Sequence, residues 1–165
     1  MKNNAQVIMN NFYIIEIFKK RRNFDVFGEE IKKSIEELGI RGIKEVRVSN
    51  LYKIEGEKLN KKICEKIAKQ LFIDNVSEDF NVYKSGRKRR NFWEIEVYLK
   101  EGVADPVGDT AKRTIIESGI LKDVNVKTGK KYYVKGKLNL EKIKEICEKI
   151  LVNNLIHNYY IKGKK

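Results

Sequence analysis

Hydrophobic and polar residues follow two periods along the chain, and the same series of periods occurs twice. Residues 12–18 and 92–99 alternate between apolar and polar positions and are rich in aromatic and β-branched residues, which is typical of β-strands. Apolar residues then recur at helical spacing, first at Phe27, Ile31, Ile35 and Leu38, and in the second half at Val107, Ala111 and Ile115. Each half therefore begins with a predicted strand and a predicted helix.

The remainder of each half predicts two short strands, a second helix and a last strand. The short strands cover 45–48 and 51–55, meeting at Ser49-Asn50, and 124–127 and 132–135, meeting near Gly129. Each predicted second helix has one apolar stripe. The stripe consists of Leu59, Ile63, Ile67 and Leu71 in the first half, and of Leu140, Ile143, Cys147, Ile150 and Leu151 in the second half. The last strands run over 76–82 and 155–161. This β-α-β-β-α-β order is that of ferredoxin-like folds, although order alone does not determine which strands pair.

The ends of the first helix carry clear signals in both halves. Asp25 and Asp105 precede the helical pattern, where a carboxylate accepts hydrogen bonds from the free amides of the first turn. Pro106 suits the first helical position, since no amide hydrogen is needed there. Gly39 and Gly119 stand where the helices should stop.

An internal repeat explains why the patterns recur. Matching residues lie 80 positions apart, as in Phe12 and Phe92, Glu16 and Glu96, or Asp25 and Asp105, and the word Cys-Glu-Lys-Ile occurs at 64–67 and again at 147–150. We expect an α+β protein with a first unit at 12–83, a basic linker at 84–91 and a second unit at 92–162. One such unit buries only about 60 % of its unfolded surface, so two copies should pair as an intramolecular pseudo-dimer. Independent beads on a string are the less favoured alternative.

The net charge of +13 is concentrated in three short segments without acidic residues, at 19–22, 84–90 and 162–165. These segments hold 12 of the 36 Lys and Arg residues, so the rest carries 24 basic against 23 acidic residues. Charge confined to a loop, a linker and a tail is typical of solvated segments, and no zinc-finger, KH or aromatic RNA-binding pattern accompanies it. Nucleic-acid binding is therefore not the favoured interpretation.

The residues of catalytic and metal chemistry are sparse. Cys64 and Cys147 lie within or beside helical apolar stripes, which favours buried thiols, and the single histidine, His157, has no acidic sequence neighbour. Neither a Gly-rich phosphate loop nor zinc-ligand spacing occurs. Two cysteines, the lack of a long apolar run and a polar start to the chain favour a cytoplasmic protein without a membrane span. The residues alone therefore favour a non-catalytic interaction module.

The second unit resembles the PurS family, the small subunit of phosphoribosylformylglycinamidine synthase in purine biosynthesis. The most specific stretch is Lys100-Glu101-Gly102-Val103-Ala104-Asp105-Pro106-Val107-Gly108, and the resemblance extends over 92–161. The first unit keeps Asp25 and Gly28 in the matching loop but lacks the Pro and the Gly-Val pair. This form is similar to the tandem PurS-like region that precedes the catalytic domains of large, fused synthases. The chain thus resembles two PurS units in one polypeptide.

The resemblance implies a non-catalytic bridge between a glutaminase subunit (PurQ-like) and a large ATP-dependent synthase subunit (PurL-like), with ATP and magnesium bound by the large subunit and no cofactor in this chain. Such a bridge would aid the transfer of ammonia and would be one subunit of an ATP-dependent carbon–nitrogen ligase. We expect the partner interface near Lys100, Asp105, Pro106 and Gly108, and near their counterparts Lys20, Asp25 and Gly28. The expected partners also include further copies of the chain in a homo-oligomer. The alternatives to the bridging function are a basic nucleic-acid-binding module using Lys19–Arg22 and the linker, and a ligand-sensing ferredoxin-like pseudo-dimer.

Overall fold

The computed structural model describes residues 11–86 and 89–163, which form two α+β units. The elements of the first unit are β1 (Phe12–Lys19), a 3₁₀ turn η1 (Arg22–Phe24), α1 (Val26–Glu37), β2 (Ile43–Glu55), α2 (Lys61–Ile67) with the π-helical turn η2 (Ala68–Phe72), and β3 (Glu78–Tyr83). Those of the second unit are β4 (Trp93–Leu99), α3 (Pro106–Glu117), β5 (Asn125–Gly136), α4 (Leu140–Ile146) with the π-helical turn η3 (Cys147–Leu151), and β6 (His157–Lys162).

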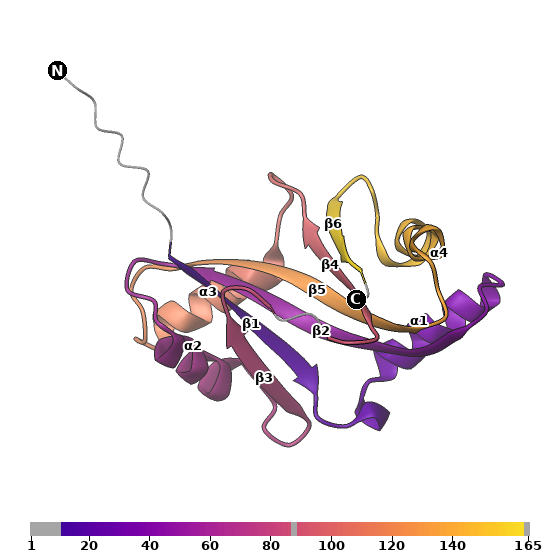
Figure 1. The fold of residues 1–165 in the computed structure, drawn as a ribbon. Helices are drawn as coiled ribbons and strands as arrows, with labels where there is room; N and C mark the ends of the chain where they lie inside the picture. The colour runs from indigo at the N-terminus through magenta and orange to yellow at the C-terminus, as the bar shows by residue number, and fades with distance from the viewer. Residues whose placement is uncertain (1–10, 87–88, 164–165) are drawn as a thin grey trace.

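The six strands form a single antiparallel sheet in the order β3-β1-β2-β5-β4-β6 (Figure 1). The central pair is β2 with β5, so the two units join by extending each other's sheet. Asn50 lies opposite Lys130, and these are positions that the 80-residue repeat equates. A pseudo-twofold axis therefore passes between them, and the predicted pseudo-dimer of two tandem units is confirmed.

The predicted turns in the middle of each unit are wrong. β2 runs through Ser49-Asn50 and β5 runs through Gly129 without a reversal, because the two strands pair with each other from Ile43 to Glu55. The ladder hydrogen bonds of this long pairing outweigh the weak turn preference of Ser, Asn and Gly. Gly129 serves close packing instead: a Cβ there would lie 2.6 Å from the ring of Tyr98.

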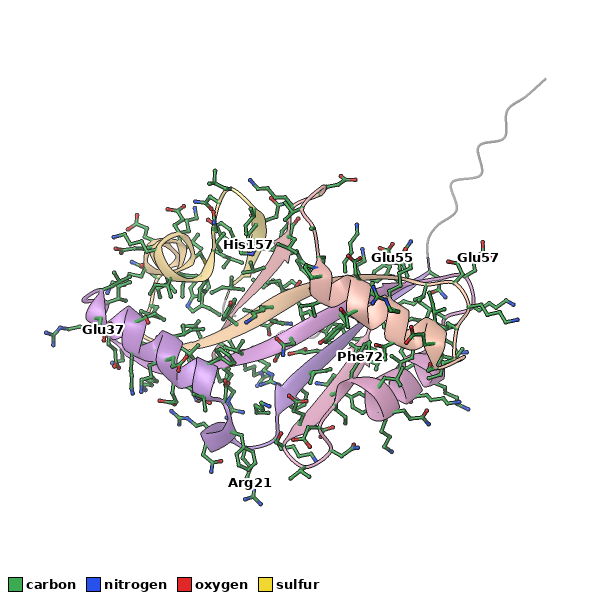
Figure 2. The ribbon with its side chains drawn as sticks, turned by 180° about the vertical axis from the view of Figure 1, so that it is seen from behind. Arg21, Glu37, Glu55, Glu57, Phe72 and His157 are labelled. Carbon is green, nitrogen blue, oxygen red and sulfur yellow. The ribbon has the colours of Figure 1, made fainter. Side chains whose placement is uncertain are left out.

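All four helices cover one face of the sheet, which Figure 2 shows from the helix side. Two buried clusters lie beneath them, and each combines helices of both units. In one, Ile35 of α1 packs with Ile143 and Ile146 of α4. In the other, Ile115 of α3 packs with Cys64 and Ile67 of α2. Because each core contains side chains from both halves, neither unit completes its own core.

Local signals set the ends of the helices as predicted. The carboxylates of Asp25 and Asp105 accept hydrogen bonds from the amides of Gly28 and Gly108, and Pro106 opens α3. Gly39 and Gly119 follow α1 and α3 with φ of +82° and +78°, the left-handed conformation that ends a helix. The loops that carry the expected interface residues are thereby held in equivalent positions in the two units.

Candidate functional site

The expected interface residues gather at two equivalent junctions, each between the first strand and the first helix of a unit. At the second junction, Asp105 accepts hydrogen bonds from the amide of Gly108 (2.8 Å), the amide of Thr128 (2.7 Å) and the hydroxyl of Thr128 (2.8 Å). At the first junction, Asp25 accepts from the amides of Gly28 and Val48, both at 2.9 Å. Each carboxylate therefore joins a helix start to the central strand of its own unit.

Gly28 and Gly108 allow the helices to approach these strands closely. A Cβ at Gly28 would lie 2.4 Å from the carbonyl oxygen of Val46, and one at Gly108 would lie 2.8 Å from that of Val126. A side chain at either position would force the backbones apart. Both glycines are thus explained by packing within the chain.

Lys20 and Lys100 fasten the same two loops to the turn before the last strand. The Lys20 amine donates to the carbonyl of Asn75 and the Lys100 amine to that of Asn154, each at 2.6 Å. The structure thus gives six of the seven predicted residues an intramolecular contact or packing role at their junction, and Pro106 a place in the first turn of α3. Their predicted contact with a partner stays a prediction.

The side chains free to meet a partner are the apolar neighbours of these residues. Val26 and Phe27 in the first turn of α1 are 60 % and 62 % exposed, and Val107, the counterpart of Phe27, is 56 % exposed. The Lys130 amine lies 5.1 Å from the centre of the Phe27 ring, which places Phe27 beside the pseudo-twofold axis. Exposed apolar side chains in both junctions are what a protein interface requires. The helical spacing grouped Phe27 and Val107 with Ile35 and Ile115 in apolar stripes, so the sequence contained no sign that these two side chains are exposed.

A hollow of about 410 Å³ adjoins Val107 on the helix side of the sheet. Its lining includes the axial residues Asn50 and Lys130, Pro106 and Val107 of α3, and His157 (labelled in Figure 2). The ring Nδ1 of His157 accepts a hydrogen bond from the amide of Asn153 at 3.1 Å. This contact gives the ring a structural partner within its own loop.

The opposite face of the sheet carries a buried polar cluster that the sequence did not predict. The Lys131 side chain, 1 % exposed, pairs with Glu94 at 3.0 Å and with Glu96 at 3.5 Å. Beside them Glu16, also buried, accepts hydrogen bonds from the hydroxyls of Tyr83 (2.8 Å) and Tyr133. Burial, and then the neighbouring Glu16 charge, raise the pKa of both phenols, so they remain donors.

The basic linker covers this cluster, which explains its burial on a face without helices. The amide of Arg89 donates to Glu94 at 2.6 Å, and the Arg89 guanidinium lies 4.3 Å from the centre of the Tyr133 ring. A Cβ at Gly86 would come within 3.4 Å of the Lys131 amine. Arg87 and Lys88, two of the basic residues of the alternative nucleic-acid interpretation, lie outside the described residues. The described linker residues thus contact the sheet directly.

The thiols have no activating surroundings. Cys64 and Cys147 are buried and unpaired, and burial raises the pKa of each thiol to about 12. Within residues 11–86 and 89–163, no group of three or more His, Cys, Asp and Glu side chains is arranged to hold a metal ion. In the same ranges, no helix is long and apolar enough to span a bilayer.

Two α+β units that share one sheet and exchange helices across a pseudo-twofold axis define the chain as a covalent pseudo-dimer. Its family follows from sequence comparison: the model of PurS, phosphoribosylformylglycinamidine (FGAM) synthase, matches residues 13–85 and again residues 93–165. The chain belongs to this family, in a tandem form, and has a role in FGAM synthase and purine biosynthesis. A comparison with curated proteins gave no significant match.

Proposed function

We propose that the chain is the non-catalytic subunit that holds the glutaminase and the ATP-dependent subunit of FGAM synthase together in the cytoplasm and aids the transfer of ammonia between them. The observation that carries this proposal is the double family match on a single continuous sheet. A pseudo-dimer built on one continuous sheet presents two similar surfaces in a fixed orientation, and this arrangement suits a bridge between two subunits. ATP and magnesium then bind to the large subunit, and this chain supplies no cofactor.

The need for a bridge follows from the chemistry of ammonia. Free ammonia would diffuse away or become protonated in bulk water, so the site that releases it and the site that uses it must be held together and shielded. In this proposal, the two junctions contact the partners through their exposed apolar side chains, Val26 and Phe27 in one unit and Val107 in the other. The buried Asp25 and the half-buried Asp105 hold these side chains in position.

The test is glutamine-driven amidine formation by the purified glutaminase and large subunits, with and without this chain, beside the ammonia-driven rate. We expect glutamine-driven turnover to require the chain and ammonia-driven turnover to persist without it. An unchanged glutamine-driven rate, together with no co-purification with either subunit, would contradict the proposal.

Two substitutions locate the contact surfaces. Phe27→Glu and Val107→Glu place a charge in the two exposed patches, and each should weaken assembly at least about tenfold, as expected for the centre of an interface. Because both side chains are exposed, the thermal midpoint of the isolated chain should not change. Leu140→Glu is the matched control, since Leu140 is a similarly exposed apolar residue at the start of α4. Loss of assembly in the control alone would place the interface elsewhere.

A further inference from the structure

The helix-free face carries a second hollow, which shares Lys100 and Asp105 with the second junction. It has a volume of about 650 Å³, within the range of small-molecule sites. Four lysines from separate segments line it: Lys53 of β2, Lys84 after β3, Lys100 after β4 and Lys127 of β5. We call it the lysine groove.

Two of these lysines stand directly opposite each other in the sheet. Lys53 pairs with Lys127 in the β2–β5 ladder, and both side chains lie on the helix-free face. Like charges in this position destabilise a sheet. Lys53 has Glu55 at 3.1 Å, whereas in the described part of the chain Lys127 makes no hydrogen bond or ion pair. An anion bound between the two amines would remove the repulsion.

The carboxylates in the lining offset only part of the positive charge of the groove. They are Glu101 and Asp105, against four amines. The oxygens of Asp105 are already engaged by Gly108 and Thr128, and Glu101 is exposed. Lys84 and Lys100 hold neutral oxygens, those of Asn11 and Asn154. The groove therefore keeps a positive excess available to a ligand.

The repeat supplies an internal comparison. Across the pseudo-twofold axis, the positions equivalent to Lys127 and Lys53 are Arg47 of β2 and Tyr133 of β5, which also lie opposite each other. There Arg47 is paired with Glu45, and Arg89 of the linker lies over the Tyr133 ring. The fold thus does not require two facing lysines, and the same place in the other half is neutralised and covered.

Aromatic side chains complete the lysine groove. Phe12, Tyr98 and Tyr160 line it from β1, β4 and β6. Flat apolar rings beside amines suit a ligand that carries both phosphates and a heterocyclic base, because bases stack on such rings and lysines bind phosphate oxygens. We propose that the lysine groove binds a nucleoside triphosphate, with its phosphates between Lys53 and Lys127 and its base against the aromatic side chains.

The test is calorimetric titration of the full chain with ATP, tripolyphosphate and adenosine in the presence of EDTA, so that no metal competes for the phosphates. We expect saturable ATP binding with a dissociation constant below about 1 mM, and about tenfold weaker binding of tripolyphosphate because it lacks the base. Adenosine, which lacks the phosphates, should bind weakest. Tripolyphosphate binding as tightly as ATP, or no saturable ATP binding, would overturn the proposal.

Two variants matched by the pseudo-symmetry assign the site. Lys127→Gln and Arg47→Gln each remove one positive charge from equivalent places. Lys127→Gln should weaken ATP binding at least about fivefold without lowering the thermal midpoint, since it relieves a like-charge pair. Arg47→Gln should change the affinity for ATP less than about twofold. Arg47 does not line the groove, so its removal only weakens the general attraction between the basic chain and an anion. Equal losses in the two variants would overturn the assignment. The readout uses the chain alone, so its result is separate from that of the bridging assay.

Discussion

Replacing Lys131 by Met is expected to lower the free energy of unfolding by about 3–5 kcal/mol, the usual effect of removing one partner of a buried ion pair. The Lys131 amine is held by Glu94 and Glu96, and its side chain is 1 % exposed. Without it, these two buried carboxylates would lose their central cation. Chemical denaturation with urea, followed by circular dichroism, measures the difference.

A second variant separates the missing charge from a packing defect. Adding Glu94→Gln and Glu96→Gln to Lys131→Met removes the negative charges that Lys131 faces while keeping the side-chain shapes. Glu96→Gln also removes the carboxylate that pairs with Lys162 at 3.2 Å. This triple variant should regain a large part of the lost stability. Lys137→Met, at an exposed position, should stay within about 0.5 kcal/mol of the original protein. If the triple variant regains no stability, the loss in Lys131→Met comes from a packing defect and not from the unpaired carboxylates.

Lys131 also shows where sequence reasoning stopped. It follows Gly129 and Lys130, where the sequence predicts a turn between two short strands, and no pattern around it predicts a buried charge. In the structure this stretch is the middle of β5, and the side chain points toward β4 and the linker. Which lysine is buried depends on contacts between residues far apart in the chain, such as Glu94 and Gly86. The local pattern of hydrophobic and polar residues contains no information about these long-range contacts.

The elements themselves were readable because their signals are local. Alternation, helical spacing, the caps at Asp25 and Asp105 and the 80-residue repeat together predicted two α+β units, and the double family match confirms them. The wrong hairpins have one cause. A strand long enough to pair with another unit cannot be told from two short ones when Ser49-Asn50 or Gly129 stands in its middle. The packing of α1 against the second unit and of α3 against the first could not be predicted either, because it too depends on contacts between residues far apart in the chain.

The exchanged helices lead to the second large effect: the second unit, produced alone as residues 92–162, should not be a folded monomer. Its helix α3 packs on Cys64 and Ile67 of the first unit, and its helix α4 packs on Ile35. Removing the first unit would expose these surfaces and the whole edge of β5. At this size, the remaining apolar burial does not offset the loss of chain entropy. Sedimentation and thermal unfolding of the fragment check this.

Producing the two units as separate chains in one cell provides the decisive comparison. The β2–β5 ladder and both cores are present again, so the units should associate one to one and regain a cooperative unfolding transition. Pairing of the first unit with itself should be weaker, because Tyr133, which donates to the buried Glu16, would be replaced by its counterpart Lys53, and the cation Lys131 by Leu51. A folded monomeric second unit would show that its core is self-sufficient and that the linker joins two independent domains. A one-to-one pair would instead make the linker a means of keeping two divergent halves at high effective concentration.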